Sequence, residues 1–431
     1  MHDICIIGAG WAGYSAAMRA KQLGLSVCLV EQSAVGGTCL NRGCIPTKVM
    51  VNSAKSFSQT KKLPNFGVEL SGAKINFEKI QSRKNAIVDK LNKGMQLQLK
   101  TKGIDFVQGK AKIVSADEIS VDSKSIKAKN IIISIGSKPT ELPFLKFDQK
   151  KIVSSDEILD IKFIPESLLI VGGGVIGCEF ASIFSSLGSK VTIVEILEHI
   201  LPNEDKDIAK KLEVAFKKKG IKVLAKTDVK SVDLDKFEKI LVCVGRIANT
   251  DLDGLEGVGI NKDKKGISVS ENLQTNIANI YAVGDCIGGH QLAHVAAYEG
   301  ETAVENISGK KIQVDYSSVP NCIFTSPEVA SVGSTEEQAN IKGISYQVSK
   351  FDFLASSMAH ILDETEGFVK IIVDSNSKEV IGASIIGPKA TELISVFSLA
   401  IKSKLTISQI HDTIFAHPTL SEAIGEAARG I

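Results

Sequence analysis

Two segments far apart in the chain share one pattern of apolar and polar positions. Each starts with a short apolar run, at residues 4–7 and 168–171, that leads directly into Gly-x-Gly-x-x-Gly. A stretch with helical periodicity follows, and a second apolar run ends at an acid, Glu31 in the first unit and Glu195 in the second. The first glycine and the acid are 23 residues apart in both units. The pattern predicts two βαβ units with the same internal register.

The glycine pattern has a physical reason if each unit binds a dinucleotide. The first glycine permits a tight turn, the second lets the backbone approach a pyrophosphate, and the third lets helix and strand pack closely. The helix N-terminus offers N–H groups to the anion, and the acid accepts hydrogen bonds from a ribose. A single match would be equally compatible with an ordinary tight turn, but both copies have the strand, helix and acid that the motif requires. The predicted contacts are Gly8, Gly10, Gly13 and Glu31 in the first unit and Gly172, Gly174, Gly177 and Glu195 in the second.

The rest of the chain has other patterns of apolar and polar positions. Residues 74–98 have the pattern of a charged amphipathic helix, and residues 104–133 have that of short strands separated by polar turns. A further strand ends at Asp285 and precedes a predicted helix at residues 292–307. Beyond residue 311 no dinucleotide motif occurs; the pattern predicts strands at 368–373 and 380–386 and helices at 390–402 and from 421 onward. We predict an α/β protein with two Rossmann-like dinucleotide-binding domains and a C-terminal α+β domain.

Composition and charge exclude several classes of protein. Lys and Arg number 51 against 49 Asp and Glu, without long blocks of like charge, so no nucleic-acid partner is expected. The N-terminus shows no basic segment, cleavage site or Arg-rich transit stretch, which predicts a cytoplasmic location. Residues 167–188 are nearly uncharged over a membrane-spanning length, but they contain Glu179 and three consecutive glycines. We interpret them as a strand, a turn and a helix, and expect no membrane association.

Two of the eight cysteines are candidates for redox chemistry. Cys39 and Cys44 lie in Gly-Gly-Thr-Cys-Leu-Asn-Arg-Gly-Cys-Ile-Pro-Thr-Lys, shortly after Glu31. In a regular helix their Cα atoms would be about 8.6 Å apart, beyond the ~6.8 Å that a disulfide tolerates, so a bridge requires the backbone to depart from the helix. Buried inert thiols, half of a zinc site and a structural disulfide are the alternatives, although the spacing suits a metal poorly and we expect no metal site. The position beside one nucleotide unit in a chain with two favours the redox role.

The other cysteines have a simpler interpretation. They occur singly in apolar strands or at strand ends, where a free cysteine acts as a small apolar residue. We expect this of Cys5, Cys28, Cys178, Cys243, Cys286 and Cys322.

His417-Pro-Thr-Leu-Ser-Glu422 near the C-terminus permits two interpretations. Thr419 and Glu422 have the spacing of a capping box ahead of an apolar stretch, in which case Glu422 closes a helix N-terminus and His417 is a surface residue. The other interpretation is a functional role for His417, which the residues alone do not specify. The residues alone favour the capping box.

Taken together, these motifs resemble one known family. The segment from Gly36 to Lys48, both glycine units, the strand that ends at Asp285 and the His-Pro-Thr motif resemble the pyridine nucleotide-disulfide oxidoreductases from end to end. Within that family the chain is most similar to the dihydrolipoamide dehydrogenase branch. The resemblance implies an FAD-binding domain at residues 1–145, a shortened NAD-binding domain at 146–273, a central segment at 274–312 that completes the FAD domain, and a dimerisation domain at 313–431.

The resemblance also implies two cofactors and the residues that hold them. FAD would bind tightly but without a covalent bond, at Gly8, Gly10, Gly13, Glu31, Thr38, Lys48, Ala111, Gly136, Ser137, Asp285, Leu292, Ala293 and His294. NAD would bind at Gly172, Gly174, Val175, Ile176, Gly177, Glu195, Val229 and Gly245. Because Glu195 would repel a 2′-phosphate, the second site is expected to prefer NAD over NADP.

Six residues take catalytic roles by the same resemblance. Substrate dithiol would reduce a Cys39–Cys44 disulfide, with Cys44 facing the flavin and Lys48 paired with Glu179 beside it. His417 would be the base that takes the thiol proton, supported by Glu422 and contributed by the second subunit of a homodimer. The implied activity is oxidation of a dihydrolipoyl group by NAD⁺, and the implied partner is the lipoyl domain of the acyltransferase subunit of a 2-oxo acid dehydrogenase complex. Another NAD(P)H-dependent disulfide or mercuric reductase, or a non-catalytic nucleotide-binding component of such a complex, is the alternative.

Some positions depart from the family pattern. Phe415 stands where the lipoamide branch often has a second histidine, Ile135 replaces a usual threonine, and Met358 replaces a common arginine. The stretch from Gly177 to Gly245 is also short, as if a β-hairpin of the NAD domain were missing.

Overall fold

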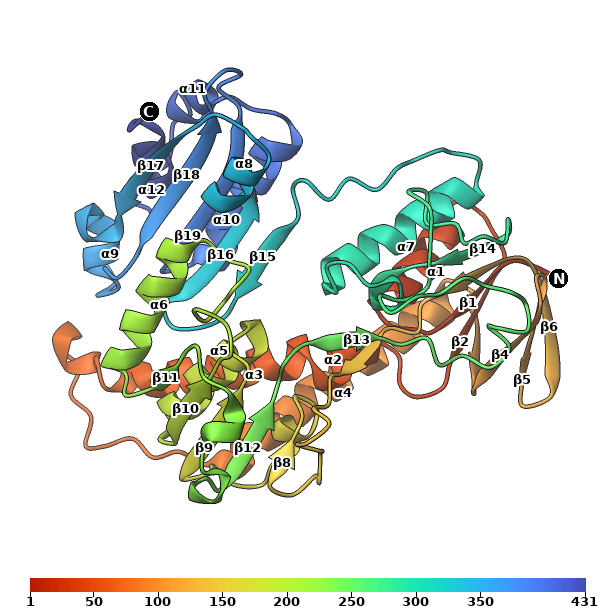
Figure 1. The fold of residues 1–431 in the computed structure, drawn as a ribbon, viewed down its shortest axis with the longest axis horizontal. Coiled ribbons are helices and arrows are strands. Elements are labelled where there is room, and N and C mark those ends of the chain that lie inside the picture. Colours follow the sequence, from red (N-terminus) through yellow and green to blue (C-terminus); the bar gives the residue numbers. More distant parts are fainter.

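The computed structural model describes residues 1–431 and contains three large sheets (Figure 1). The first sheet has a parallel part in the order β3-β2-β1-β6, with β14 also paired to β6, and an antiparallel extension through β5 and β4. Its strands are β1 His2–Ile7, β2 Val27–Glu31, β3 Asp105–Gln108, β4 Ala111–Ser115, β5 Glu118–Val121, β6 Lys124–Ile133 and β14 Ile280–Ala282. The pairing of β14 with β6 brings the segment after residue 274 back into the N-terminal sheet.

Helices pack around this sheet, and one of them connects it to the second sheet. The helices are α1 Trp11–Gln22, α2 Gly37–Arg42, α3 Cys44–Thr60, α4 Phe77–Thr101 and α7 Ala293–Ile307, with a 3₁₀ turn, η1, at Leu63–Phe66 and another, η5, at Gly284–Ile287. α1 and α7 pack against each other, and a methyl group at Gly300 would lie 2.2 Å from the carbonyl oxygen of Ala12. The glycine therefore allows the two helices their close approach. α3 runs from the first sheet towards the second and packs against α5 (Figure 1).

The second sheet is entirely parallel, in the order β11-β10-β9-β12-β8. Its strands are β8 Ile152–Val153, β9 Ser167–Val171, β10 Lys190–Val194, β11 Lys222–Leu224 and β12 Lys239–Val242, and its helices are α5 Val175–Leu187 and α6 Lys206–Lys218. The connection from β11 to β12 holds only two 3₁₀ turns, η3 Val229–Ser231 and η4 Leu234–Lys236, and no strand. A two-stranded ribbon of β7 Ser137–Pro139 and β13 Arg246–Ala248 joins this part of the chain to the first.

The third sheet is antiparallel, in the order β15-β16-β19-β18-β17. Its strands are β15 Pro320–Ile323, β16 Glu328–Gly333, β17 Tyr346–Asp352, β18 Phe368–Asp374 and β19 Val380–Gly387. The helices around it are α8 Glu336–Ile341, α9 Ser357–Ile361, α10 Ala390–Lys402, α11 Ile407–His411 and α12 Glu422–Ala428. An extended segment without helix or strand leads into it from α7 (Figure 1).

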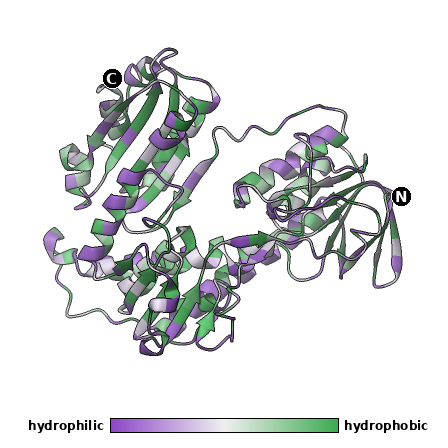
Figure 2. Ribbon diagram, viewed as in Figure 1, coloured by the Kyte–Doolittle hydropathy of each residue, from purple (hydrophilic) through white to green (hydrophobic).

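Hydrophobic burial explains why each sheet forms where it does. Most strands of the three sheets are largely hydrophobic, although edge strands and the start of β6 also carry hydrophilic positions, and many helix positions are hydrophilic (Figure 2). The strands β1, β2 and β9 are buried along nearly their whole length, as expected for a parallel sheet covered on both faces. In the charged helix α4, by contrast, only Gln81, Lys84 and Leu99 are buried.

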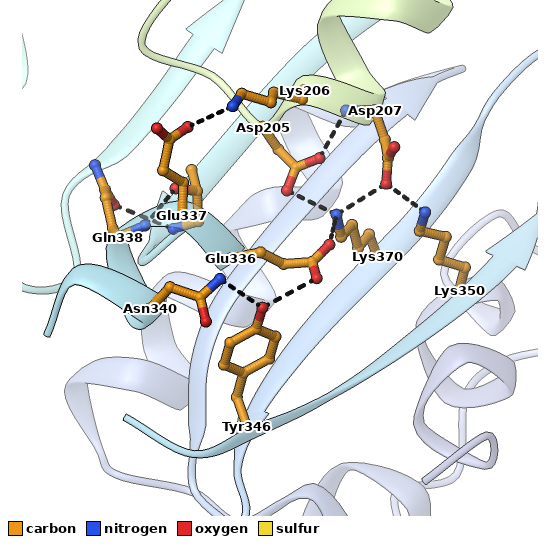
Figure 3. A network of polar contacts seen from close by, with 11 residues as sticks. Asp205, Lys206, Asp207, Glu336, Glu337, Gln338, Asn340, Tyr346, Lys350 and Lys370 are labelled. Carbon is orange, nitrogen blue, oxygen red and sulfur yellow. Dashed lines mark hydrogen bonds and ion pairs between the residues drawn. The ribbon is translucent and has the colours of Figure 1, made fainter. Parts of the chain in front are cut away.

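A buried ion network joins the second and third sheets (Figure 3). Lys370 of β18 is 1% exposed, and its Nζ lies 2.7 Å from Oδ2 of Asp205 and 3.0 Å from Oδ2 of Asp207, at the start of α6. Glu336 of α8 also pairs with this ammonium group. Because a lone buried charge is very costly, the three carboxylates are what permit a lysine inside this interface.

Most predicted elements agree with the structure within a few residues. The stretch 167–188 is β9, a glycine turn and α5, as predicted, and no helix of the chain has the length and apolarity to cross a bilayer. The charged helix begins at Phe77 rather than residue 74, because the side chain of Asn76 accepts the N–H of Lys79 and caps the first turn. The last helix begins at Glu422 rather than 421.

Candidate active site

The two glycine turns have the same close packing. A methyl group at Gly13 would lie 1.9 Å from the carbonyl oxygen of Gly8, and one at Gly177 would lie 2.0 Å from that of Gly172. Only glycine fits at the third position of either motif, because helix and strand touch there. Gly8 and Gly172 have φ of 103° and 109°, which is a backbone conformation that glycine adopts without strain.

The two acids have matching partners as well. Glu31 accepts the N–H of Ala9 at Oε2 and that of Ser33 at Oε1, both at 2.7 Å. Glu195 accepts the N–H of Gly173 at 2.6 Å and that of Leu197 at 2.8 Å. Each carboxylate therefore holds its own glycine turn, and each oxygen keeps a second lone pair for a ribose hydroxyl.

The residues around both turns fit a dinucleotide. No side chain caps α1 or α5, so the first N–H groups of both helices stay available to an anion. A methyl group at Gly174 or at Gly136 would meet no protein atom within 4 Å. The space beside both glycines is therefore open to a bound molecule. The predicted contacts Val175 and Ile176 form the first turn of α5.

Other predicted cofactor residues lie near these turns. Ser137 donates a hydrogen bond from Oγ to Asp285, and Arg246 donates to Ser137 through Nε at 2.8 Å. Burial lowers the pKa of the Arg246 guanidinium, and the nearby Asp156 and Asp285 oppose that shift. Gly245, with φ of 111°, directly precedes this arginine. Thr38 is in α2, and Leu292, Ala293 and His294 form the start of α7, where burial lowers the pKa of His294.

Ala111 and Val229 lie at equivalent places beside the two acids. Ala111 opens β4, two residues after Gly109, whose N–H donates to the carbonyl oxygen of Glu31 at 2.9 Å. Val229 opens η3, two residues after Thr227, whose N–H donates to the carbonyl oxygen of Glu195 at 3.0 Å. Both side chains are buried in hydrophobic cores, so only their backbone can reach a cofactor.

The predicted departure from helix geometry occurs between Cys39 and Cys44. α2 ends at Arg42, Gly43 adopts φ −142° and ψ −114°, and α3 begins at Cys44. The break brings the two thiols into mutual hydrogen-bonding contact; both are free and partly buried. A methyl group at Gly43 would lie 3.0 Å from the carbonyl oxygen of Thr38, so a larger residue here would be tightly packed against the end of α2.

The two thiols differ electrostatically. The hydrogen bond from Cys39 lowers the pKa of Cys44 to about 7, with help from the positive charge of Lys48 and against the effects of burial and Glu179. The same contact with Cys44 raises the pKa of Cys39, as does burial. Cys44 is therefore the thiolate of the reduced pair, and Cys39 is its hydrogen-bond donor.

Lys48 and Glu179 form the expected pair. The ammonium nitrogen lies 2.9 Å from both oxygens of Glu179, whose side chain is only 5% exposed. Glu179 Oε1 also accepts the N–H of Phe324 at 2.9 Å, and Lys48 lies over the Phe324 ring, 4.6 Å from its centre. The pair thus joins α3, α5 and the segment after β15.

His417 and Glu422 are hydrogen-bonded to each other in the C-terminal part of the chain. His417 Nδ1 lies 2.8 Å from Glu422 Oε1, and Glu422 Oε2 accepts the N–H of Thr419 at 2.8 Å. The hydroxyl of Thr419 contacts Ala416 and Ser421 instead of the backbone of Glu422, so the reciprocal capping box is absent. His417 is 73% exposed and has no interaction with the cysteines of its own chain.

The structure also places side chains near the site that the sequence did not indicate. Trp11, the residue after the second glycine of the first motif, acts to lower the pKa of the Cys39 thiol, and Phe324 and Arg246 contact the residues described above. The glycine motif does not specify the residue type at position 11, so the one signal in the sequence is that Trp11 is the single tryptophan of the chain.

Five of the six remaining cysteines are buried, and Cys322 is half-buried. No three acidic, histidine or cysteine side chains are arranged to hold a metal ion.

The sequence profile of the pyridine nucleotide-disulphide oxidoreductases matches residues 2–300, and that of the dimerisation domain of the same family matches residues 319–428. The chain belongs to this family. Membership makes it an FAD-dependent oxidoreductase, in which the two dinucleotide folds imply FAD and NAD(H).

Curated relatives are similar over nearly their whole length. A dihydrolipoyl dehydrogenase of Bacillus subtilis is 43% identical, covering 99% of this chain and 97% of its own. One of Chlamydia muridarum is 39% identical, covering 99% and 96%. The first alignment runs over 460 positions, more than the 431 residues of this chain, so the chain lacks residues that the relative has. The strand-free connection from β11 to β12 is consistent with the missing hairpin that the sequence indicates.

Solved structures have the same fold. The HOCl-induced flavoprotein disulfide reductase RclA of Escherichia coli superposes with a TM-score of 0.89 at 30% identity, covering 99% of both chains. LpdA of Mycobacterium tuberculosis superposes with a TM-score of 0.91 at 27% identity, covering 99% of this chain and 98% of its own.

Proposed function

We propose that this enzyme is a dihydrolipoyl dehydrogenase, which oxidises protein-bound dihydrolipoyl groups to lipoyl groups with NAD⁺ and releases NADH and a proton. The observation that carries the proposal is the contacting pair Cys39 and Cys44, with Lys48 and Glu179 beside it, in a chain with two dinucleotide folds. The curated relatives named above support the choice of substrate.

In this mechanism the resting enzyme has a Cys39–Cys44 disulfide. A substrate thiolate attacks the sulfur of Cys39, the bond to Cys44 breaks, and the electron pair moves to Cys44. Because the pKa of Cys44 is about 7, its thiolate is a good leaving group at neutral pH. The second substrate thiol then attacks the substrate sulfur bonded to Cys39, the lipoyl disulfide forms, and Cys39 leaves as a thiol.

The chain's own residues prepare the site for electron transfer. Lys48, held by Glu179, provides a fixed positive charge that favours the thiolate of Cys44. FAD, when bound, would supply the two-electron redox chemistry that links the reduced cysteines to NAD⁺. The open space beside Gly136 and Gly174 and the uncapped helices α1 and α5 are where we place the two cofactors.

His417 is the proposed base for the substrate thiol. With Glu422 on Nδ1, the imidazole presents Nε2 to substrate, and the carboxylate supports the imidazolium that forms. His417 is exposed and makes no contact with the cysteines of its own chain, so we propose that it serves the cysteine pair of a second copy. Exposed apolar residues of the third domain, Leu399 and Ile414 among them, suit a homodimer interface. We propose the lipoyl domain of a 2-oxo acid dehydrogenase complex as the partner.

Reduction of another disulfide is the second candidate function, favoured by the structural similarity to RclA. The deciding experiment measures turnover of the purified holoenzyme with dihydrolipoamide and NAD⁺, and with NADH or NADPH and oxidised glutathione. We expect NADH formation from dihydrolipoamide and little activity with NADP⁺, because Glu195 disfavours a 2′-phosphate. Turnover with NADPH and a disulfide but none with dihydrolipoamide would overturn the proposal.

A further inference from the structure

A buried glutamate of α7 holds the turn that carries Asp285. Glu299 is 4% exposed, and its Oε2 accepts the N–H of Gly284 at 2.6 Å. The sheet ends just before this turn, where the N–H of Val283 donates to the carbonyl oxygen of Ile133 at 2.9 Å. The Glu299 carboxylate therefore satisfies the first backbone N–H beyond the sheet.

The turn is tightly packed between α1 and α7. Gly284 has φ of 72°, and a methyl group there would lie 3.1 Å from Cβ of Ala12 in α1 and 3.4 Å from Cβ of Ala296 in α7. The next residue, Asp285, accepts the hydroxyl of Ser137 at Oδ2, while its Oδ1 has no hydrogen-bond partner in the chain. Because Asp285 follows Gly284 directly, a shift of the turn would move this unpaired carboxylate oxygen.

A tyrosine of the segment that enters the third domain holds Glu299 in place. The hydroxyl of Tyr316 donates to Oε1 of Glu299 at 2.7 Å, so each carboxylate oxygen has one donor. The Tyr316 ring also packs against the ring of His290, in the loop between η5 and α7, with ring centres 5.2 Å apart. The preceding residue, Asp315, pairs with Lys402 of α10 at 2.7 Å. The segment is therefore fixed to the third domain at one residue and to α7 at the next.

These polar groups keep one another in position. Burial raises the pKa of the Glu299 carboxyl, and the hydrogen bonds from Tyr316 and Gly284 oppose that shift. A buried polar group that loses its partner costs free energy, so displacement of Glu299 would be unfavourable for the Gly284 N–H as well as for the carboxyl itself. The arrangement is present before any ligand binds.

We propose that Glu299 is a positioning residue for the FAD site: it fixes the turn at Gly284 so that Oδ1 of Asp285 faces a hydroxyl group of bound FAD, and Tyr316 keeps Glu299 in this place. The inference rests on the proposed role of Asp285 in holding FAD. Glu299 acts only through the turn, since its side chain is buried and both of its oxygens accept donors of the chain itself. A carboxylate that is already held in the binding orientation loses less freedom when its ligand arrives.

The rate of FAD release from the holoenzyme tests the inference without any substrate. Purified holoenzyme is diluted, free flavin is removed by repeated filtration, and the flavin that stays bound is measured by visible absorbance. Glu299→Ala removes both contacts, and Tyr316→Phe removes only the hydroxyl. Glu299→Gln keeps an oxygen that accepts the Gly284 N–H and an amide that donates to the Tyr316 oxygen. Glu301→Ala is the matched control, because Glu301 is an exposed acid of the same helix.

We expect Glu299→Ala to release FAD roughly tenfold faster than wild type and Tyr316→Phe about threefold faster, as lost hydrogen bonds of ordinary strength predict. Glu299→Gln and Glu301→Ala should stay within about twofold of wild type, since both keep the two contacts. Release at the wild-type rate in both Glu299→Ala and Tyr316→Phe would overturn the proposal. Tyr316→Phe alone decides the question if Glu299→Ala fails to fold, because it removes a single hydroxyl group.

A double substitution separates positioning from a general effect on the fold. If Glu299 acts through Asp285, Glu299→Ala should change the release rate of an Asp285→Ala variant by less than about twofold. Independent effects that multiply would show that Glu299 acts on the fold as a whole and would overturn the proposal. Faster release in Asp285→Ala but not in Glu299→Ala would overturn this inference alone, whereas wild-type release in Asp285→Ala would also refute the proposed FAD contact. A protein that fails to oxidise dihydrolipoamide but shows the expected release rates would support this inference while refuting the proposed substrate.

Discussion

Lys48 Nζ lies 2.9 Å from both carboxylate oxygens of Glu179, and this pair joins the helix of the redox cysteines to the helix of the second glycine turn. The two charges act on the Cys44 thiol in opposite directions: Lys48 lowers its pKa and Glu179 raises it. One ion pair therefore both connects two domains and adjusts the thiol that leaves first in the proposed mechanism.

Opposite substitutions in this pair should shift the Cys44 pKa in opposite directions. In wild type the pKa is lowered to about 7, so the thiolate exists above pH 7 and is lost as the pH falls through that value. We expect Lys48→Met to raise the midpoint and Glu179→Gln to lower it, as followed by the thiolate ultraviolet absorbance of the reduced protein. Lys55→Met is the matched control, since Lys55 lies on the same helix α3 and pairs with Glu328 at 3.6 Å. Shifts of the same sign in both variants would contradict the electrostatic account.

Replacement of His417 should remove the base without disturbing the fold. We expect His417→Gln to reduce the turnover number for dihydrolipoamide by about 10²–10⁴-fold, with cofactor content and melting temperature unchanged. His411→Gln is the control, because His411 is an exposed histidine of the same domain with its own carboxylate neighbour, Asp412, at 3.0 Å. Near-normal turnover in His417→Gln would show that His417 is a surface residue without a role as the base.

Alanine substitutions at two glycines of the second turn should have different effects, one on stability and the other on nucleotide binding. Gly177→Ala forces a methyl group to within 2.0 Å of the Gly172 carbonyl, so we expect a loss of about 1–3 kcal/mol in the free energy of unfolding. Gly174→Ala meets no protein atom and should fold normally, but its methyl group occupies the space proposed for the pyrophosphate. Its KM for NAD⁺ should rise at least roughly tenfold, as expected for a lost close approach of backbone to phosphate. A normal KM in Gly174→Ala would place the nucleotide elsewhere.

The buried network around Lys370 should matter for stability rather than for turnover. Lys370→Met leaves Asp205, Asp207 and Glu336 facing one another, and we expect a loss of about 3–5 kcal/mol in the free energy of unfolding, measured by denaturant titration. Lys350 and Lys370 lower the pKa of Asp207 to about 2, so its contribution is complete above the unfolded pKa near 4 and is lost as the pH falls towards 2. A Lys370→Met variant as stable as wild type would show that the network adds nothing.

Sequence patterns predicted the features that local chemistry determines. The glycine motifs and their acids specify two turns, and the structure gives Glu31 and Glu195 the same pair of backbone partners. The cysteine spacing required a departure from the helix, and Gly43 supplies it. These features depend on neighbours close in sequence or on a repeated βαβ unit, which is why periodicity and spacing were enough.

Contacts between distant segments could not be predicted in the same way. Nothing near Lys370 in the sequence indicates that its ammonium group meets carboxylates more than 160 residues away. The spacing of Thr419 and Glu422 predicted a reciprocal cap, but only one half of it forms: Glu422 accepts the Thr419 N–H and also contacts the His417 ring, while the Thr419 hydroxyl donates elsewhere. The position of Trp11 near α2 was not predicted, because it depends on the starts of α1 and α2 meeting, which the glycine motif does not encode.

We propose that the cysteine pair of one chain works with His417 of another, and mixing of variant subunits can test this pairing. Cys44→Ser and His417→Gln chains with different affinity tags are co-expressed, and the mixed dimers are purified through both tags. Each variant alone should be inactive with dihydrolipoamide and NAD⁺. In a mixed dimer one site would combine intact cysteines with an intact histidine, so we predict about half of the wild-type turnover per dimer. Mixed dimers as inactive as the parent variants would show that each chain uses its own histidine and would contradict the account.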